Sequence, residues 1–315
     1  MSPGIATRHL GLDLGATNLK WAMVEQDGEA WSTVAREQVP TRLASTPEDV
    51  PAAVVGQLGE VAAAAIATCG PAMSVGIGVP GLYDPASGTT RFLVNLPGPW
   101  AGHPVAGPVA DAVGLPTALI NDARAFGLAE LHLGAARGAS SMIGLTLGTG
   151  VGGVIAIDGR VHQGHDGTGG EIGHQTIDPD GPACGCGNRG CVEAFARADR
   201  IAAACGTATA EEAVARARAG DPQAVEGMAQ IGRYLGIGIA NMIAVVTPDR
   251  VVIGGGIGGK SRSVDTAPIP PPIRAEVELR VKTTALDRVE LVAAELGTWA
   301  GAIGAAVHGA EAARS

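Results

Sequence analysis

Three of the five cysteines in this 315-residue chain, Cys184, Cys186 and Cys191, fall within eight consecutive residues. His174 precedes them by ten residues, and glycines and prolines fill much of the stretch between. Three thiolates and one imidazole complete a tetrahedral zinc site, and a site with no open position is typical of a structural metal. A disulfide is the alternative, but no N-terminal segment resembles a secretory signal, so we expect a reducing compartment. The stretch therefore predicts a zinc-pinned loop.

Composition limits the classes of function that this chain can have. Hydrophobic residues make up 46% of the sequence, which is enough for well-packed cores, and the length allows two domains. The net charge of −9, with no basic stripe, argues against a nucleic-acid partner. The longest apolar run, residues 236–246, is shorter than the roughly 20 residues that a bilayer-spanning helix needs. We expect a cytoplasmic protein without membrane or nucleic-acid partners.

A short apolar strand over residues 9–14 ends in the pattern D-x-G-x-T, which contains Asp13, Gly15 and Thr17. A carboxylate can hold hydrated Mg²⁺, while a glycine backbone and a hydroxyl can approach phosphate oxygens. An ordinary hairpin turn would explain the glycine equally well. The pattern alone is therefore compatible with a phosphate loop but does not require one.

The same short sequence occurs a second time in the chain. GLDLG at residues 11–15 is echoed by GLTLG at residues 144–148, and Thr149 and Gly150 follow directly. Each copy is a strand that leads into a glycine loop and then into another strand. The echo predicts two duplicated α/β halves, each of which contributes one phosphate loop around a nucleotide.

Residues 116–120 predict a strand that delivers Asn121 and Asp122 to the start of an amphipathic helix ending near residue 133. A carboxylate at the carboxyl end of a strand faces the ligand crevice of an open α/β sheet. Asp122 could there accept the proton of an attacking hydroxyl. Alternatively, it could cap the helix by accepting from its free N–H groups. The residues alone leave both interpretations open.

The segment GEIGH at residues 170–174, followed by C-x-C-G-x-x-G-C-x-E at residues 184–193, resembles the signature of the ROK family of bacterial sugar kinases and sugar-responsive repressors. The resemblance extends over residues 10–306 and includes N-D-A-x-A-x-x-x-A-E at residues 121–130. It implies an α/β, actin-like (ribonuclease H-like) fold of two lobes around a cleft. Residues 1–121, joined by a C-terminal helix at about 300–315, would form the N-terminal lobe. Residues 122–299 would form the C-terminal lobe, with the zinc loop at residues 171–193.

The resemblance also implies a role for single residues. Asp122 would be the catalytic base that accepts the proton of a hexose 6-hydroxyl. The sugar would be held by Asn121, Glu171, His174 and Glu193, with Gly81 and Asn95 at its border, although turn chemistry would also explain Asn95. ATP and Mg²⁺ would be bound by Asp13, Gly15, Thr17, Asn18, Thr149, Gly150, Gly255 and Gly256. The structural zinc ligands would be His174, Cys184, Cys186 and Cys191.

Several alternatives remain at this stage. Glucose leads as the substrate, but an amino sugar (kanosamine, glucosamine, N-acetylglucosamine or N-acetylmannosamine) would also suit a carboxylate-lined pocket. A repressor would carry a DNA-binding domain before its first phosphate loop, and because that loop begins at Asp13 we do not expect a repressor. A polyphosphate-dependent kinase would generally lack the zinc loop, and a non-catalytic sugar sensor would not need Asp122. A homodimer is expected from the family resemblance.

Residues 254–261 also satisfy the pattern G-x-x-x-x-G-K-[ST] of a P-loop. That mechanism requires a helix that begins at the Lys-Ser end, and the polar, proline-rich residues 262–272 do not predict one. We interpret the match at Lys260 as fortuitous. Ala16 and Val154 stand where the family more often has glycine.

Overall fold

The computed structural model describes residues 6–256 and 270–314. The chain divides into two compact units. The first contains Met1–Leu133, Gln163–Gly169 and Trp299–Ser315, and the second contains Gly134–His162 and Gly170–Thr298. The expected boundary after residue 121 therefore differs from the observed division, in which the helix that follows Asn121 belongs to the first unit. The C-terminal helix also belongs to the first unit.

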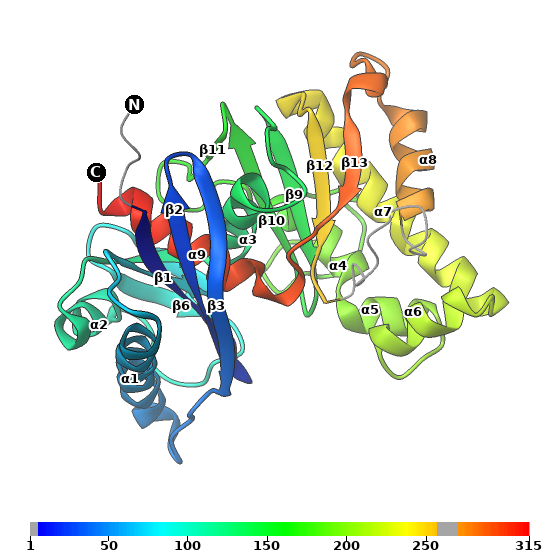
Figure 1. Cartoon of the computed structure of the whole chain (residues 1–315). Coiled ribbons are helices and arrows are strands. Elements are labelled where there is room, and N and C mark those ends of the chain that lie inside the picture. The colour runs from blue at the N-terminus through cyan, green and yellow to red at the C-terminus, as the bar shows by residue number, and fades with distance from the viewer. Residues whose placement is uncertain (1–5, 257–269, 315) are drawn as a thin grey trace. The chain divides into compact units, whose positions relative to one another are not determined.

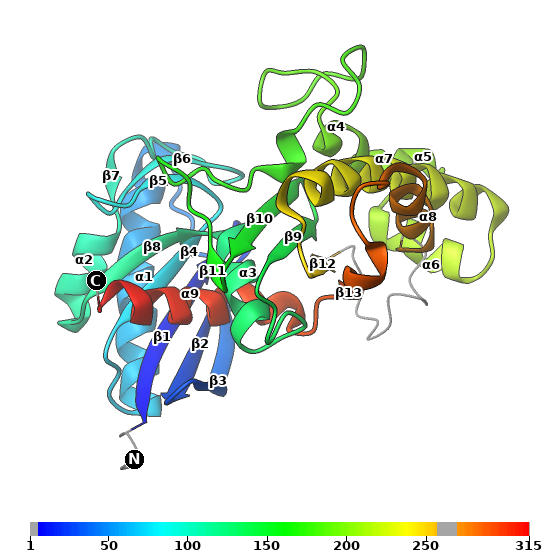
Figure 2. The same ribbon diagram turned by 90° about the horizontal axis from the view of Figure 1, so that it is seen from above.

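The first unit is built on a five-stranded sheet with the order β3-β2-β1-β4-β8 (Figures 1 and 2). Strands β1, β2 and β3 are joined by tight turns and pair antiparallel, whereas β4 and β8 lie parallel to β1. The strands are β1 (Thr7–Leu14), β2 (Asn18–Asp27), β3 (Ala30–Pro40), β4 (Val75–Val79) and β8 (Thr117–Asn121).

The two faces of this sheet are covered in different ways. Leu10, Leu12 and Leu14 of β1 are buried in one hydrophobic cluster with α1 (Val50–Cys69). Side chains alternate along a strand, so Gly11 faces the opposite side. There a Cβ atom would lie 1.8 Å from a backbone carbonyl oxygen of α9 (Ala300–Ala312). Figure 2 shows α1 and α9 on opposite sides of the strands. The absence of a side chain at Gly11 lets α9 lie directly against the sheet.

The second unit repeats this topology. Its sheet has the order β11-β10-β9-β12-β13. The consecutive strands β9, β10 and β11 are joined by turns and pair antiparallel, and β12 and β13 lie parallel to β9. The strands are β9 (Met142–Leu147), β10 (Val151–Ile157), β11 (Arg160–Val161), β12 (Arg250–Gly254) and β13 (Glu290–Ala293). The duplicated α/β halves predicted from the echo are therefore confirmed, and each copy of the echo lies at the carboxyl end of the first strand of its sheet.

Helices of the second unit bury one face of this sheet. Ile143, Leu145 and Leu147 of β9 join a cluster dominated by apolar side chains of the long helix α7. The helices are α4 (Val192–Ala196), α5 (Ala198–Ala204), α6 (Ala210–Arg218), α7 (Pro222–Val246) and α8 (Pro270–Arg280). The sequence of residues 194–205 suggests a single helix, but the structure has two, because the backbone of Arg197 is extended with a φ of −72° and a ψ of 162°.

The sequence of residues 82–100 suggests a loop, but the structure forms strands there. This region contains most of a three-stranded antiparallel sheet made of β5 (Gly81–Asp84), β6 (Thr89–Leu93) and β7 (His103–Pro104). Asp84 makes the turn, because its Oδ1 accepts hydrogen bonds from the backbone N–H groups of Ala86 and Ser87. The helix α2 (Ala106–Val113), which follows this sheet, was not predicted. The helix α3 (Asp122–His132), which follows β8, was predicted.

Two helices are long and apolar enough to span a membrane by length and composition, namely Pro47–Cys69 and Pro222–Val246. The expectation that no apolar segment is long enough to span a bilayer was therefore wrong, since α7 begins at Pro222, well before residue 236. Of their most apolar windows, 50% and 44% respectively is buried within the protein. Both helices contribute to the hydrophobic cores just described, and core helices commonly satisfy the same criterion.

Candidate functional site

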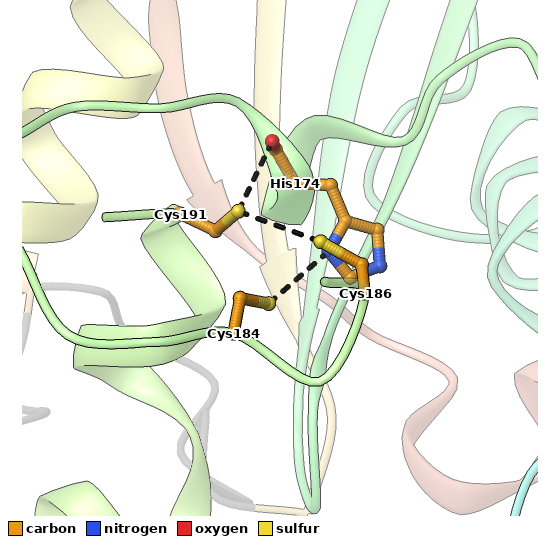
Figure 3. A group of neighbouring side chains, drawn as sticks. All are labelled: His174, Cys184, Cys186 and Cys191. Atoms are coloured by element: carbon orange, nitrogen blue, oxygen red, sulfur yellow. Dashed lines mark hydrogen bonds between the residues drawn. The ribbon is translucent and has the colours of Figure 1, made fainter. Parts of the chain in front are cut away.

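The four side chains predicted to bind zinc converge in the second unit (Figure 3). Their ligand atoms all lie within 4.8 Å of one another. The Nδ1 of His174 lies 3.7 Å from the Sγ of Cys184. The Sγ atoms of Cys186 and Cys191 are also 3.7 Å apart. Zn–S bonds of about 2.3 Å place the sulfur atoms of a tetrahedral site about 3.8 Å apart. The spacing of these atoms therefore fits one tetrahedral ion.

Local backbone structure explains how the loop gathers these ligands. The N–H of Cys184 donates to the carbonyl of Asn188 at 2.8 Å, which closes a tight turn around Cys186. Gly190 has a φ of 65°, and a Cβ there would lie 1.5 Å from the carbonyl oxygen of Asp178, so only glycine fits. Cys191 is the N-cap residue of α4 and is thereby fixed by the start of that helix.

The ionisation of the three cysteine thiols would also favour a bound cation. All five cysteines, each of which the structure describes, are free thiols rather than disulfides. Burial raises the pKa of Cys184, and it raises the pKa of Cys191 to about 12. The backbone N–H of Asn188 lowers the pKa of Cys186. Three adjacent thiolates repel one another, so a divalent cation is the group that would allow all of them to ionise together.

His174 presents its two ring nitrogens to different neighbours. Its Nδ1 faces Cys184, whereas its Nε2 lies 4.0 Å from the Oε2 of Glu171. One nitrogen can therefore ligate a metal while the other remains available to hydrogen-bond a ligand, as the sequence suggested. Glu171 is exposed at the start of the short helical turn Ile172–His174.

Thr149 and Gly150 form the turn between β9 and β10. The turn is closed by a hydrogen bond of 3.0 Å from the N–H of Gly148 to the carbonyl of Gly150. Thr149 is exposed. The carboxylate of Glu193 approaches this turn, because its Oε2 accepts a hydrogen bond of 3.0 Å from the N–H of Val151. The sequence did not predict this contact, because it depends on the placement of α4.

In the first unit, the equivalent turn contains Gly15, Thr17 and Asn18. The N–H of Gly15 donates to the carbonyl of Asn18 at 3.1 Å, and a Cβ on Gly15 would lie 2.8 Å from the same oxygen. Thr41, which directly follows β3, supports the turn, since its hydroxyl donates to the carbonyl of Gly15 at 2.7 Å. Thr17 is exposed at the tip.

Asp13, one strand residue before this turn, is largely enclosed. Its side chain is 17% exposed and its Oδ2 lies 3.7 Å from the Nζ of Lys20. Burial raises the pKa of Asp13, and Lys20 offsets part of this effect. A Cβ on Gly301, in the first turn of α9, would lie 2.6 Å from the Asp13 carboxyl carbon. The register Asp13↔Lys20 follows from the hairpin, so this ion pair was available from the sequence.

Asn121 and Asp122 occupy different positions at the start of α3. Asn121 is the N-cap: its Oδ1 accepts from the N–H groups of Ala123 and Arg124 at 3.0 and 3.3 Å. Its Nδ2 donates to the carbonyl of Gly81 at 3.2 Å. Asp122 is the first helical residue, is exposed, and accepts from the N–H of Ala123 at 2.8 Å. Asn121 is therefore the N-cap, and Asp122 accepts from one of the same N–H groups, so its capping and catalytic interpretations both stay open.

The remaining candidates are glycines and Asn95. Gly81 has a φ of 147°, and its Cβ would lie 2.2 Å from the carbonyl oxygen of Phe92. Asn95 is exposed with a φ of 63°, which favours the turn explanation for it. Gly255 has a φ of 94° and follows β12, and Gly256 is exposed. Lys260 and most of the P-loop-like pattern lie outside the described residues.

The structure thus gathers the candidates into two groups. In the first unit, Asp13, Asn18, Gly81 and Asn121 to Asp122 lie at the carboxyl ends of β1, β4 and β8 or in the turn after β1. In the second unit, Thr149 and Gly150 lie beside Glu193 and the cysteine cluster.

Comparisons with known proteins agree over the full length. The sequence model of the ROK family matches residues 9–310. A glucokinase of Thermotoga maritima is 34% identical over 316 residues, covering 94% of this chain and 95% of that relative. An N-acetylmannosamine kinase of Citrobacter koseri is 35% identical over 253 residues, covering 79% of this chain and 83% of that relative.

Two solved structures extend the likeness to the fold. A ROK hexokinase from Thermus thermophilus superimposes with a TM-score of 0.83 at 33% identity, covering 98% of this chain and 99% of that one. A ROK glucokinase from Streptomyces griseus, in complex with glucose and AMPPNP, gives a TM-score of 0.74 at 28% identity, covering 96% of this chain and 99% of that one.

Proposed function

Because this chain belongs to the ROK family, we propose that it is an ATP-dependent hexokinase whose substrate is glucose. It transfers the γ-phosphate of ATP to the 6-hydroxyl of the sugar. The observation that carries the proposal is the identity of 34% to a glucokinase over 94% of this chain. It is supported by the carboxylate of Asp122, which is exposed at a strand's carboxyl end directly after the N-cap residue Asn121.

Asp122 accepts the proton of the 6-hydroxyl as that oxygen attacks the γ-phosphorus. The sugar is held by Asn121, Glu171, His174 and Glu193, whose carboxylate, amide and imidazole groups can all hydrogen-bond hydroxyls. Gly81 and Asn95 border the sugar.

The nucleotide is bound by backbone N–H groups and hydroxyls of the two β-turns, at Gly15, Thr17, Asn18, Thr149 and Gly150, with Gly255 and Gly256 against the adenosine. A bound Mg²⁺ would supply positive charge against the phosphates. Asp13 suits its hydrated shell, because an enclosed carboxylate supplies the oxygen ligands that Mg²⁺ prefers.

Zinc, held by His174, Cys184, Cys186 and Cys191, has a structural role. Purified protein should contain about one zinc per chain, because all four ligand positions are filled by protein. We also propose that the protein acts in the cytoplasm, where ATP is available, and that it is a homodimer. Size-exclusion chromatography with light scattering tests the last point, and a monomeric mass would exclude the dimer.

An amino sugar is the second candidate substrate. The N-acetylmannosamine kinase that is 35% identical over 79% of this chain supports it. A carboxylate can pair with the ammonium of glucosamine or kanosamine, whereas an acetamido group needs additional space beside the ring.

One assay distinguishes these candidates. ADP release from Mg-ATP is measured with glucose, mannose, fructose, glucosamine, 3-amino-3-deoxyglucose, N-acetylglucosamine and N-acetylmannosamine. Glucose should give the highest kcat/KM. A higher value for an amino sugar would replace glucose with that substrate. No turnover on any sugar by folded, zinc-loaded protein would overturn the proposed ATP-dependent hexokinase and favour a sugar sensor or a different phosphate donor.

A further inference from the structure

Glu193 makes two contacts at once, and they belong to different parts of the second unit. Its Oε2 accepts a hydrogen bond of 3.0 Å from the N–H of Val151, at the end of the glycine turn between β9 and β10. Its Oε1 lies 3.6 Å from the Sγ of Cys184 in the cysteine cluster. A single carboxylate therefore bridges the turn that carries Thr149 and Gly150 and the loop that carries the metal ligands.

The turn is shaped to receive this carboxylate. A Cβ on Gly150 would lie 2.4 Å from the Oε2 of Glu193, so any side chain at this position would displace the carboxylate. At the other end of the turn, the carbonyl of Gly148 accepts a hydrogen bond of 2.9 Å from the N–H of Ala198. Both ends of the turn are thus fastened to the segment from Glu193 to Ala198. Of these two hydrogen bonds, the one at Gly148 joins backbone groups, and the one at Val151 is made by the side chain of Glu193.

The cysteine cluster fixes the position of the Glu193 backbone. Cys191 is the N-cap of α4, and Glu193 is the second residue of that helix. A zinc ion would convert Cys184 to a thiolate, which cannot donate a hydrogen bond to Glu193. The connection that remains when the metal is bound therefore runs through the backbone, from the Cys191 ligand to the first turn of α4 and then to the Glu193 carboxylate.

From these contacts we propose that Glu193 is a positioning residue for the nucleotide as well as a contact for the sugar. Its carboxylate holds the Gly148–Val151 turn in the conformation that presents Thr149 and Gly150 to phosphate. Through it, the structural zinc supports ATP binding. This inference rests on the proposed function, because it assigns the turn to the phosphate groups of ATP.

Binding and exchange measurements test the inference without requiring turnover. Zinc-loaded wild type, Glu193→Ala and Glu193→Gln are compared by AMPPNP titration in the absence of sugar and by hydrogen exchange of the Val151 amide. The alanine variant should bind AMPPNP at least about tenfold more weakly and exchange Val151 at least about tenfold faster, because a hydrogen bond to a charged acceptor is lost. The glutamine variant should recover most of both properties, because its amide oxygen can accept from Val151.

Glu226→Ala is the matched control, since Glu226 is an exposed glutamate on α7 in the same unit. It should bind AMPPNP as wild type does. If Glu193→Ala raises only the KM for sugar, with wild-type AMPPNP affinity and Val151 exchange, the inference is wrong. Should the alanine variant not fold, Glu193→Asp, whose shorter side chain cannot reach Val151, takes its place with the same expected losses.

Removal of zinc tests the coupling directly. A chelator should accelerate hydrogen exchange of the Val151 amide in wild type, but it should accelerate it little further in Glu193→Ala. Removal of zinc and removal of the Glu193 carboxylate would release the same turn, so their effects on exchange are non-additive. Fully additive effects would overturn the route through Glu193. If wild type binds AMPPNP and shows this coupling but phosphorylates no sugar, the proposed function fails while the positioning role of Glu193 stands.

Discussion

Asn121 and Asp122 are adjacent, yet the structure predicts opposite consequences for their substitution. Replacing Asp122 with Asn should lower kcat by about 100-fold or more, because the amide cannot accept the proton of the sugar hydroxyl. The fold should be unaffected. The Asp122 side chain is exposed, and an amide oxygen can still accept from the N–H of Ala123. Surface changes of this kind alter the free energy of unfolding by about 0.5 kcal/mol or less.

Replacing Asn121 with Ala should destabilise the protein. It removes the acceptor for two N–H groups at the start of α3, which costs about 1 kcal/mol. It also removes the buried donor to the carbonyl of Gly81, which costs about 1 kcal/mol more. The sum of about 2 kcal/mol corresponds to a Tm lower by about 4–8 °C for a unit of this size.

Steady-state kinetics and differential scanning calorimetry on both variants separate the two roles. Asp111→Asn, which changes an exposed aspartate on α2 of the same unit, is the control and should match wild type in both measurements. A kcat for Asp122→Asn within threefold of wild type would refute the assignment of the base. A Tm for Asp122→Asn as low as that of Asn121→Ala would show that Asp122 is structural.

Three further predictions follow from the packing, burial and metal-ligand chemistry. Gly76→Ala puts a methyl group 1.7 Å from a carbonyl oxygen of α9 and should cost about 3 kcal/mol or more in urea unfolding, whereas Gly56→Ala, with open space around it, should not destabilise. Burial lowers the pKa of His9, so as the pH drops below about 6.5 the unfolded chain binds a proton before the folded protein does, and the free energy of unfolding decreases as the pH is lowered. This decrease should be shallower in His9→Gln. Equal pH slopes for wild type and variant would contradict the reasoning. Cys186→Ser should lower the zinc content measured by elemental analysis, and Cys205→Ser, which changes a buried core thiol, should leave it at about one per chain.

The strands and the duplication could be predicted from the sequence because their signals are local. Apolar runs end at glycine turns, and the GLDLG and GLTLG segments each end the first strand of a sheet, with equivalent strand orders in the two sheets. The cysteine cluster was equally accessible, since four ligands within 18 residues can reach one another without help from the rest of the fold.

Other features could not be predicted because they depend on distant segments. Nothing in the sequence around Glu193 indicates that its carboxylate accepts from Val151, since that contact requires α4 to lie beside the β9–β10 turn. The β5–β6 hairpin was missed because it buries few side chains, and Phe92 at its centre is 59% exposed. Which of the 48 glycines face α9 likewise becomes clear only when the helix is in place.

The position of α9 has a consequence for the order in which the chain can fold during its synthesis. Gly11 and Gly76 leave one face of the first sheet bare until α9 covers it. Between His132, the last residue of α3, and Ala300, the first of α9, a ribosome must add about 170 residues, which takes roughly 10–30 s.

During that interval the first unit is made but lacks the helix that completes it. The second unit, whose sheet and helices lie almost entirely between Gly134 and Thr298, is complete before α9 emerges. We therefore expect the half of the protein that is synthesised second to fold first. The N-terminal sheet would spend this time with an uncovered face, which makes it the part of the nascent chain most in need of a chaperone.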